Sequence, residues 1–183
     1  MAKALFTLTI LGIITTGIGW AGQPSVTAET SVLVVSSPAF ATSGIIPARY
    51  TCAGEDASPP LAWRGVPHGT KTLALVVDDP DAPSGTFTHW IVYNINRDSS
   101  GLPENSPEVP QPAVKYSQAI NDFGHLGYNG PCPPPGTPHH YHFKLYALAA
   151  KLDLPRNATA KQLAAAMRGQ ILAVGETIAT FER

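Results

Sequence analysis

Short apolar runs separated by turn residues dominate the chain after its first thirty residues. Thr72–Val77 is a continuous apolar run bounded by turns, which is typical of a strand covered on both faces. Other strands are expected at Ser31–Val35, His89–Ile95, His139–Leu148 and Glu176–Phe181, with an extended piece at Ile45–Cys52 that is interrupted at Pro47 and an apolar triplet at Leu61–Trp63.

One helix is predicted near the end of the chain. Thr159 and Gln162 have the spacing of a capping box. Leu163, Ala166 and Met167 continue an apolar stripe at helical spacing, and Gly175 is the expected stop. Many short strands followed by one or two late helices predict a mainly β fold, an antiparallel β-sandwich with peripheral helices near the C-terminus.

Strand alternation predicts which side chains share a face. In the strand from residue 89 it places His89, Ile91 and Tyr93 on one face and Trp90, Val92 and Asn94 on the other. In the strand from residue 139 it places His139 and Tyr141 on one face and His140 and His142 on the other.

The first residues are typical of an export signal. Lys3 precedes an apolar run, Leu5–Ile18, and small residues flank Trp20 where a signal peptidase would cut. Residues 1–21 are therefore interpreted as a signal peptide, 22–30 as a flexible lead-in and 31–183 as one domain. An uncleaved anchor is the alternative. The prediction is a periplasmic or secreted protein.

Composition narrows the range of partners. The formal net charge is −1 and 14% of residues are charged, so the balance does not favour nucleic acid. Cys52 and Cys132 are the only cysteines. In an exported chain they are a disulfide candidate, and two separate buried thiols are the alternative.

Val76–Asn94 concentrates stiffness and charge in one stretch. Asp79 and Ala82 each precede a proline, which pushes both toward extended backbone. Either X-Pro bond could be cis, since the trans preference is only about 0.5–1 kcal/mol. Such a segment can hold the Asp79 carboxylate in place. A proline-rich turn with solvated acids is the alternative interpretation.

Six histidines raise the question of a metal site. Because alternation separates His139 from His140 and His142, the three cannot easily share one ion. His140 and His142 alone could bind metal at a surface. The favoured grouping is Asp79, His89, His139 and Tyr141, which would offer donors to a small anion.

Two long motifs resemble the phosphatidylethanolamine-binding protein family, also called the Raf kinase inhibitor protein family, in its bacterial and archaeal branch. The first comprises DPDAPSG (Asp79–Gly85) and THWIVYNI (Thr88–Ile95). The second comprises GYNGPCPPPG (Gly127–Gly136) and HHYHFKLYAL (His139–Leu148). Supporting matches are YTCAGEDASPPLAW (Tyr50–Trp63) and MRGQILAVGE (Met167–Glu176).

The resemblance implies an antiparallel sandwich and a pocket for phosphate-like or phosphoethanolamine-like anions. By motif position, the implied pocket residues are Asp79, His89, Gly130, Pro134, His139 and Tyr141. It also implies a cis peptide near Asp79–Pro83. His140 stands where many relatives have arginine, and Cys132 replaces a small residue of eukaryotic relatives.

Three functions follow as hypotheses. The first is an exported, non-catalytic binding protein for a small phosphate-containing anion, with no cofactor and no metal. The second is an inhibitor or regulator that docks a protein such as a kinase or protease. The third is a hydrolase. This hypothesis is disfavoured, because no nucleophile-elbow signature surrounds Ser84. Membrane contact is expected at most through lipid headgroups.

Overall fold

The computed structural model describes residues 32–107 and 115–183. The predicted signal peptide (1–21) and lead-in (22–30) lie outside these residues, as does Ser31. Ten elements follow one another: β1 (Val34–Ser36), η1 (Ala48–Tyr50), β2 (Leu61–Arg64), β3 (Thr72–Asp79), β4 (Phe87–Asn96), β5 (Gly101–Leu102), β6 (Ser117–Gln118), β7 (His139–Leu148), α1 (Ala160–Met167) and β8 (Ile171–Phe181).

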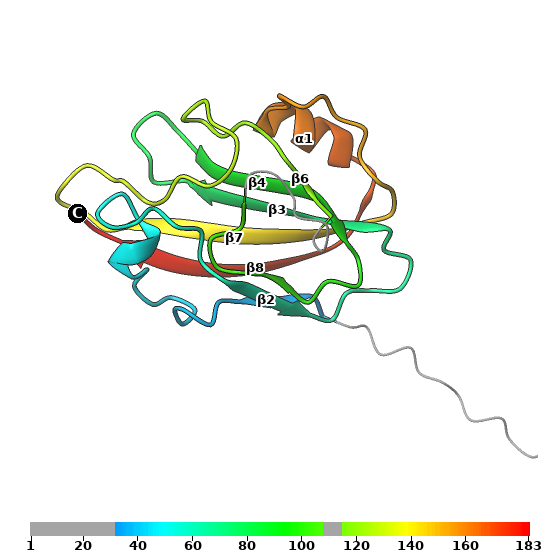
Figure 1. Cartoon of the computed structure of the whole chain (residues 1–183), viewed down its shortest axis with the longest axis horizontal. Helices are drawn as coiled ribbons and strands as arrows, with labels where there is room; N and C mark the ends of the chain where they lie inside the picture. Colours follow the sequence, from blue (N-terminus) through cyan, green and yellow to red (C-terminus); the bar gives the residue numbers. More distant parts are fainter. Residues whose placement is uncertain (1–31, 108–114) are drawn as a thin grey trace, which may run out of the picture.

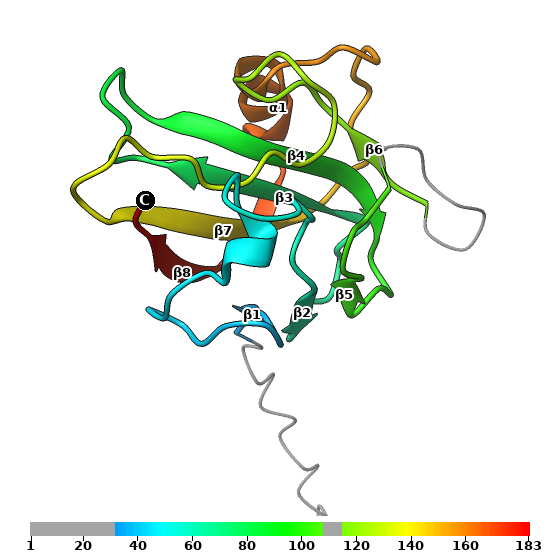
Figure 2. The same cartoon turned by 60° about the vertical axis from the view of Figure 1, so that its left-hand side comes forward.

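The strands form two antiparallel sheets (Figures 1 and 2). The larger sheet has the order β6-β4-β3-β7-β8, and the smaller has the order β1-β2-β5. The predicted fold class, mainly β with a helix near the C-terminus, is confirmed. The long strands β3, β4 and β7 lie where the sequence pattern predicted strands, whereas β8 begins at Ile171, earlier than the predicted start at Glu176.

Apolar side chains fill both sides of the larger sheet. Between the sheets lie Val77, Trp90 and Phe143 with the inner residues of β1 and β2. On the outer face, α1 covers part of the sheet and buries Leu163 and Met167 against it (Figure 2). Because β3 contributes to both clusters, all eight of its residues are buried. The predicted two-sided burial of Thr72–Val77 is confirmed.

A bulge in β4 corrects the predicted faces of that strand. Val77 pairs with Trp90, but Asp78 pairs with Thr88, so His89 is an extra residue in the ladder. His89 therefore packs against the inner residue Tyr141, while Ile91 and Tyr93 belong to the core under α1. The prediction that His89 shares a face with Ile91 and Tyr93 is wrong, because alternation does not continue through a bulge.

Three further predictions are wrong in detail. After Pro47 the chain forms the 3₁₀ turn η1 instead of continuing extended. The helix ends at Met167, where Gly169 turns the chain with a φ of 75°, well before Gly175, which lies inside β8. No peptide bond in residues 32–107 and 115–183 is cis, so the implied cis bond near Asp79 is absent.

Candidate functional site

A cavity of about 280 Å³ opens at one end of the larger sheet. β3 ends there, and its antiparallel neighbours β4 and β7 begin there. Chain direction therefore brings the last residue of β3 and the first residues of β4 and β7 together. The lining residues are Asp79, Ala82, Pro83, Ser84, Phe87, His89, Phe123, Cys132, Pro133, Pro134, His139 and Tyr141.

Asp79 and His139 form the first anchored pair of the cavity. Asp79 Oδ2 lies 2.7 Å from His139 Nδ1, and both side chains are buried. Asp79 Oδ1 also accepts the backbone N–H of Asp81 at 2.9 Å. A carboxylate oxygen accepts, so Nδ1 of His139 donates. Nε2 is then the ring nitrogen that remains for a ligand.

His89 is anchored in the same manner by a different partner. Its Nδ1 lies 2.8 Å from the carbonyl oxygen of Asn129, which can only accept. Burial lowers the pKa of His89, although the backbone carbonyl of Asn129 and the charge of Asp79 oppose that shift. His89 is therefore neutral at neutral pH, and Nε2 is its free ring nitrogen.

Tyr141 contributes the one buried side-chain polar atom without a hydrogen-bond partner among the described residues. Its side chain is fully buried and lines the cavity. Burial raises the pKa of Tyr141 well above its usual value, and the nearby Asp79 carboxylate adds to that rise. The phenol therefore stays protonated, so it can donate to a ligand.

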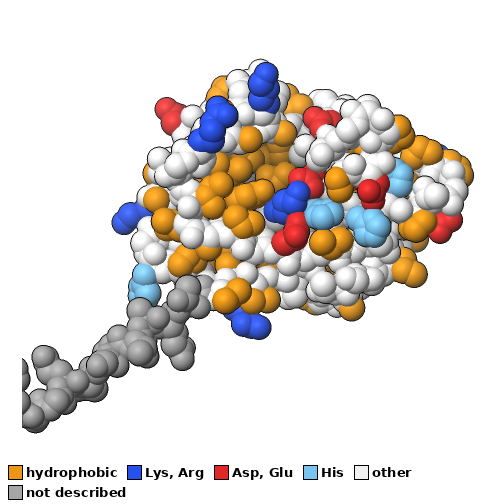
Figure 3. All heavy atoms as spheres, turned by 180° about the vertical axis from the view of Figure 1, so that it is seen from behind, with side chains coloured by type: hydrophobic (Ala, Val, Ile, Leu, Met, Phe, Trp, Pro, Cys, Tyr) orange, Lys and Arg blue, Asp and Glu red, His pale blue; other side chains and the backbone are white. Residues whose placement is uncertain are grey.

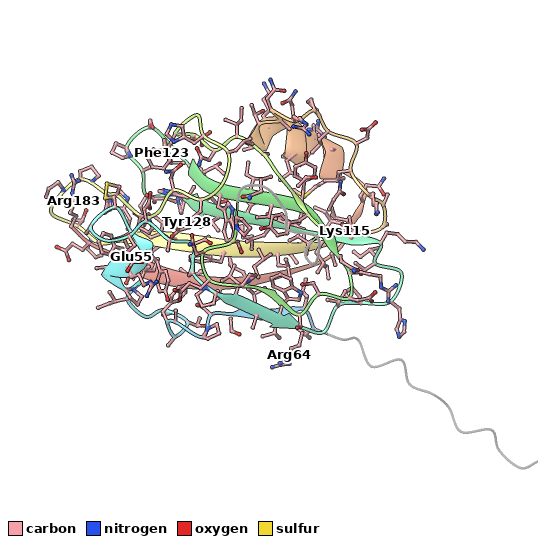
Figure 4. All side chains as sticks on the ribbon, viewed as in Figure 1. Glu55, Arg64, Lys115, Phe123, Tyr128 and Arg183 are labelled. Carbon is pink, nitrogen blue, oxygen red and sulfur yellow. A yellow bond between two sulfur atoms is a disulfide. The ribbon has the colours of Figure 1, made fainter. Side chains whose placement is uncertain are left out.

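An apolar rim surrounds this polar floor. Phe87, Phe123 and His89 pack edge to face, with ring centroids 4.8 to 5.4 Å apart. Phe123, labelled in Figure 4, is partly exposed at the end of the molecule where the cavity opens. Pro133 and Pro134 complete the rim, and Pro134 is where the resemblance implied it.

Gly130 is not among the lining residues, which differs from its implied role. Its N–H donates to Asp56 Oδ1 at 2.6 Å, and a Cβ there would lie 2.4 Å from the carbonyl oxygen of Tyr50. Gly130 therefore allows its loop to pack closely against the segment that follows η1. The adjacent Asn129 carbonyl, which orients His89, had no distinguishing signal in the sequence.

Cys52 and Cys132 form a disulfide, with Cα atoms 5.4 Å apart. Cys132 belongs to the cavity lining, and the backbone N–H of Cys52 donates to the carbonyl of Pro131 at 3.1 Å. The bridge thus fixes the proline-rich wall of the cavity to the segment after η1.

The outward histidines of β7 have separate partners. His140 Nδ1 lies 2.7 Å from Asp81 Oδ2, and His142 Nδ1 lies 2.8 Å from Glu176 Oε1. Figure 3 shows histidine and acidic side chains side by side on this outer face. The predicted division of the faces of β7 is confirmed. Over residues 32–107 and 115–183, no group of three or more His, Cys, Asp and Glu side chains is arranged to hold a metal ion.

Comparison with known protein families identifies one that matches most of the chain. The family model described as phosphatidylethanolamine-binding protein matches residues 36–182. The chain belongs to the phosphatidylethanolamine-binding protein family. The predicted resemblance is therefore confirmed over both motifs.

Relatives of this family member occur in archaea and bacteria. It is 50% identical over 145 residues to a UPF0098 protein of Methanothermobacter thermautotrophicus, covering 79% of this chain and 95% of that protein. It is 42% identical over 151 residues to the putative lipoprotein LppC of Mycobacterium tuberculosis, covering 82% and 72% of the two chains.

A solved structure supports the fold independently. The crystal structure of CT736, a putative phosphatidylethanolamine-binding protein homologue from Chlamydia trachomatis, has a TM-score of 0.77 and 37% identity. The match covers 84% of this chain and 99% of that one. Within the described ranges, no helix of this family member has the length and apolar character needed to span a membrane.

Proposed function

We propose that this family member is an exported, non-catalytic binding protein whose cavity takes a small phosphate-like anion. The observation that carries the proposal is the Tyr141 hydroxyl, which is buried against the cavity without a hydrogen-bond partner in residues 32–107 and 115–183. An unpaired buried polar group costs about 1–3 kcal/mol. A ligand oxygen that accepts from this hydroxyl would remove that cost.

The two histidines suit the same ligand. Their Nδ1 atoms are held by Asp79 and Asn129, so each ring is oriented before a ligand arrives. The Nε2 atoms can contact the oxygens of a tetrahedral anion or its hydroxyl proton. An anion beside the Asp79 carboxylate brings two negative charges together. Binding should therefore be accompanied by proton uptake at His89, whose ring is neutral in the free protein.

The rim indicates what the anion carries. Phe87, Phe123 and the prolines present apolar surface directly above the polar floor. A phosphate with a short carbon chain, such as phosphoethanolamine, would place its oxygens on the floor and its methylenes against this rim. The family description, phosphatidylethanolamine-binding, is compatible with that ligand class.

The cavity contacts favour binding over hydrolysis. Two lining residues carry a hydroxyl, Tyr141 and Ser84, and Ser84 is exposed. Among the side-chain hydrogen bonds of the described residues, none joins Ser84 to His89 or His139. An activated serine needs a base within hydrogen-bond reach.

Export is proposed from the leader and the disulfide together. Residues 1–21 have the pattern of a signal peptide, and a disulfide persists in oxidising compartments. The putative lipoprotein name of one relative points in the same direction. N-terminal sequencing of the protein recovered outside the cytoplasm would test the cleavage.

Tyr141→Phe tests the anion proposal because it removes one hydroxyl and keeps the ring. We expect thermal unfolding to shift upward with phosphate and with phosphoethanolamine in the wild type. Without ligand the variant should be as stable as the wild type or more so, since the lost hydroxyl has no partner. Its affinity for both anions should fall about tenfold.

Tyr146→Phe is the matched control, since Tyr146 is partly buried against the core under α1 and lies outside the cavity. It should leave both affinities unchanged. Wild-type unfolding that ignores both anions would contradict the proposal, and protein docking would replace it. Turnover of a phosphate ester, lost in His139→Ala, would contradict the non-catalytic part.

A further inference from the structure

Three lysines gather at the end of the larger sheet that lies opposite the anion cavity. Two adjoining cavities of about 300 and 190 Å³ share Asn94, Lys115 and Lys151, and Lys71 lines the smaller one. Lys71 precedes the first residue of β3, whereas Asp79 is its last. An eight-residue strand separates the two sites by about 25 Å. Figure 4 shows Lys115 and Phe123 at opposite ends.

The backbones that carry these lysines are fixed by the sheet. Lys71 N–H donates to the carbonyl of Leu148, the last residue of β7, at 2.8 Å. Lys115 precedes Tyr116 and Ser117, and Ser117 pairs with Tyr93 of β4. Three segments far apart in sequence are thus held around one hollow, which is more order than scattered surface lysines have.

Asn94 holds the segment of the third lysine through a left-handed backbone conformation. Its φ of 55° is a left-handed conformation at an irregularity of β4. In that conformation its amide accepts from Leu152 N–H at 2.9 Å and donates to Leu152 carbonyl at 2.8 Å. Lys151 directly precedes Leu152, so these two hydrogen bonds fix the backbone beside Lys151. Asparagine is among the few non-glycine residues that adopt left-handed backbone readily, and here that conformation aims its amide at Leu152.

The three ammonium groups have no acidic partner among the described residues. Of the lysines in that part of the chain, Lys144 is the one that forms an ion pair, with Asp78 on the outer face of the sheet. Of the nearby acids, Asp98 pairs with Arg97, and Asp153 follows Lys151 by two residues without an ion pair in the described part of the chain. Three like charges around one hollow repel one another, and a bound anion would relieve that repulsion.

We propose that Lys71, Lys115 and Lys151 form a second binding site, which takes a small multivalent phosphate anion such as a di- or triphosphate group. Three separated ammonium groups match a ligand with several charged oxygens better than a single phosphate. The three lysines line two adjoining hollows and not a flat face, which suits a compact soluble anion better than a membrane surface. Because the two sites lie at opposite ends of the sheet, this anion would bind independently of the one that the first cavity takes.

The test is calorimetric titration of the full chain with tripolyphosphate, at low and at physiological ionic strength. Apart from any binding at the first cavity, we expect one binding event, and its affinity should fall as the salt concentration rises. Lys115→Gln and Lys151→Gln should each weaken it about tenfold, and the triple variant with Lys71→Gln should abolish it. These side chains are exposed, so circular dichroism should show an unchanged fold.

Two controls separate this site from non-specific charge attraction and from the first cavity. Lys161→Gln removes an exposed lysine of α1 and should leave tripolyphosphate binding unchanged. Tyr141→Phe should also leave it unchanged, even where it weakens phosphate binding at the first cavity. Equal weakening by Lys161→Gln would mean non-specific attraction and would overturn the proposal.

Two other results would also overturn it. The first is tripolyphosphate binding in the triple lysine variant that equals the wild type. The second is capture on phosphatidylglycerol vesicles without tripolyphosphate binding, which would assign the lysines to a membrane surface instead.

Discussion

The two ends of the five-stranded sheet hold their polar groups in opposite ways. At the cavity end, Asp79, His89 and His139 are buried, and each has a short hydrogen bond that orients it. At the lysine end, the charged groups are exposed, and only the backbones that carry them are fixed.

This difference implies two kinds of recognition. Buried, oriented nitrogens and one unpaired hydroxyl select a ligand by geometry, and salt screens such contacts weakly. Exposed ammonium groups select by charge, and salt screens them strongly. Removing the buried, hydrogen-bonded groups Asp79, His89 or His139 should therefore alter stability and affinity together, whereas changes to the lysines should alter affinity alone.

Removing the disulfide should cause the largest change, and its effect on binding should be confined to the cavity end of the sheet. In the chain-entropy model, a bridge across a sequence separation of 80 contributes about 4.5 kcal/mol. Cys52→Ser with Cys132→Ser should lower the melting temperature by about 10 °C. It should also weaken phosphate binding, because Cys132 is part of the cavity wall. Calorimetric melting and titration would measure both effects.

The lysine end provides the control for that experiment. Tripolyphosphate binding should survive in the same double variant at a temperature where the protein remains folded. Alkylation and intact mass of the untreated wild type should reveal no free thiol. Two alkylated thiols, or equal melting temperatures, would show that the bridge is absent in solution.

His139→Ala should be the next largest change. It leaves the buried Asp79 carboxylate without its partner, and breaking a buried pair in this way costs about 3 kcal/mol. Phosphate binding should also be lost. His142→Ala is the matched control on the other face of β7, where Glu176 is partly exposed. Its effect on the free energy of unfolding should stay within about 0.5 kcal/mol.

Chemical denaturation of both variants, with phosphate titration, would make the comparison. Equal losses of phosphate affinity in the two variants would contradict the division of faces along β7.

Sequence pattern predicted the parts of the site that depend on local rules. Apolar runs located β3, β4 and β7, and alternation correctly separated His139 and Tyr141 from His140 and His142. The capping box at Thr159 located the start of α1. These features depend on residues close together in the chain, so a pattern read along the chain can predict them.

The remaining features depend on partners distant in sequence. The bulge at His89 is defined by the register of β4 against β3, which alternation does not encode. The unpaired Tyr141 hydroxyl is recognisable only once its surroundings are known. The lysine cluster joins three segments whose sequences share no motif. Tertiary packing, not local propensity, determines all three.

Asn94→Ala should have a smaller effect and should act at the lysine end. The variant loses both hydrogen bonds to Leu152 and places alanine at a positive φ. We expect the free energy of unfolding to fall by about 2 kcal/mol.

Asn94→Gly is the matched variant, because glycine tolerates the backbone conformation but cannot form the hydrogen bonds. It should be less destabilised than alanine, and tripolyphosphate binding should weaken in both. Denaturant unfolding and titration would measure the two effects, and equal destabilisation by alanine and glycine would show that the backbone at residue 94 is not strained.

The smallest effect is a pH dependence confined to the cavity end. Burial lowers the pKa of His89, so the unfolded state binds a proton that the free folded state does not. Stability of the free protein should therefore fall as pH drops below about 6.5, the ordinary histidine value.

The affinity for an anion should depend on pH in the opposite direction. An anion that favours the protonated His89 ring should bind more tightly as pH falls, by up to about tenfold per pH unit. Sulfate is the suitable probe, since its charge is constant over this range of pH. His89→Gln should flatten the profile. A wild-type affinity for sulfate that is independent of pH would show that His89 takes no part in binding.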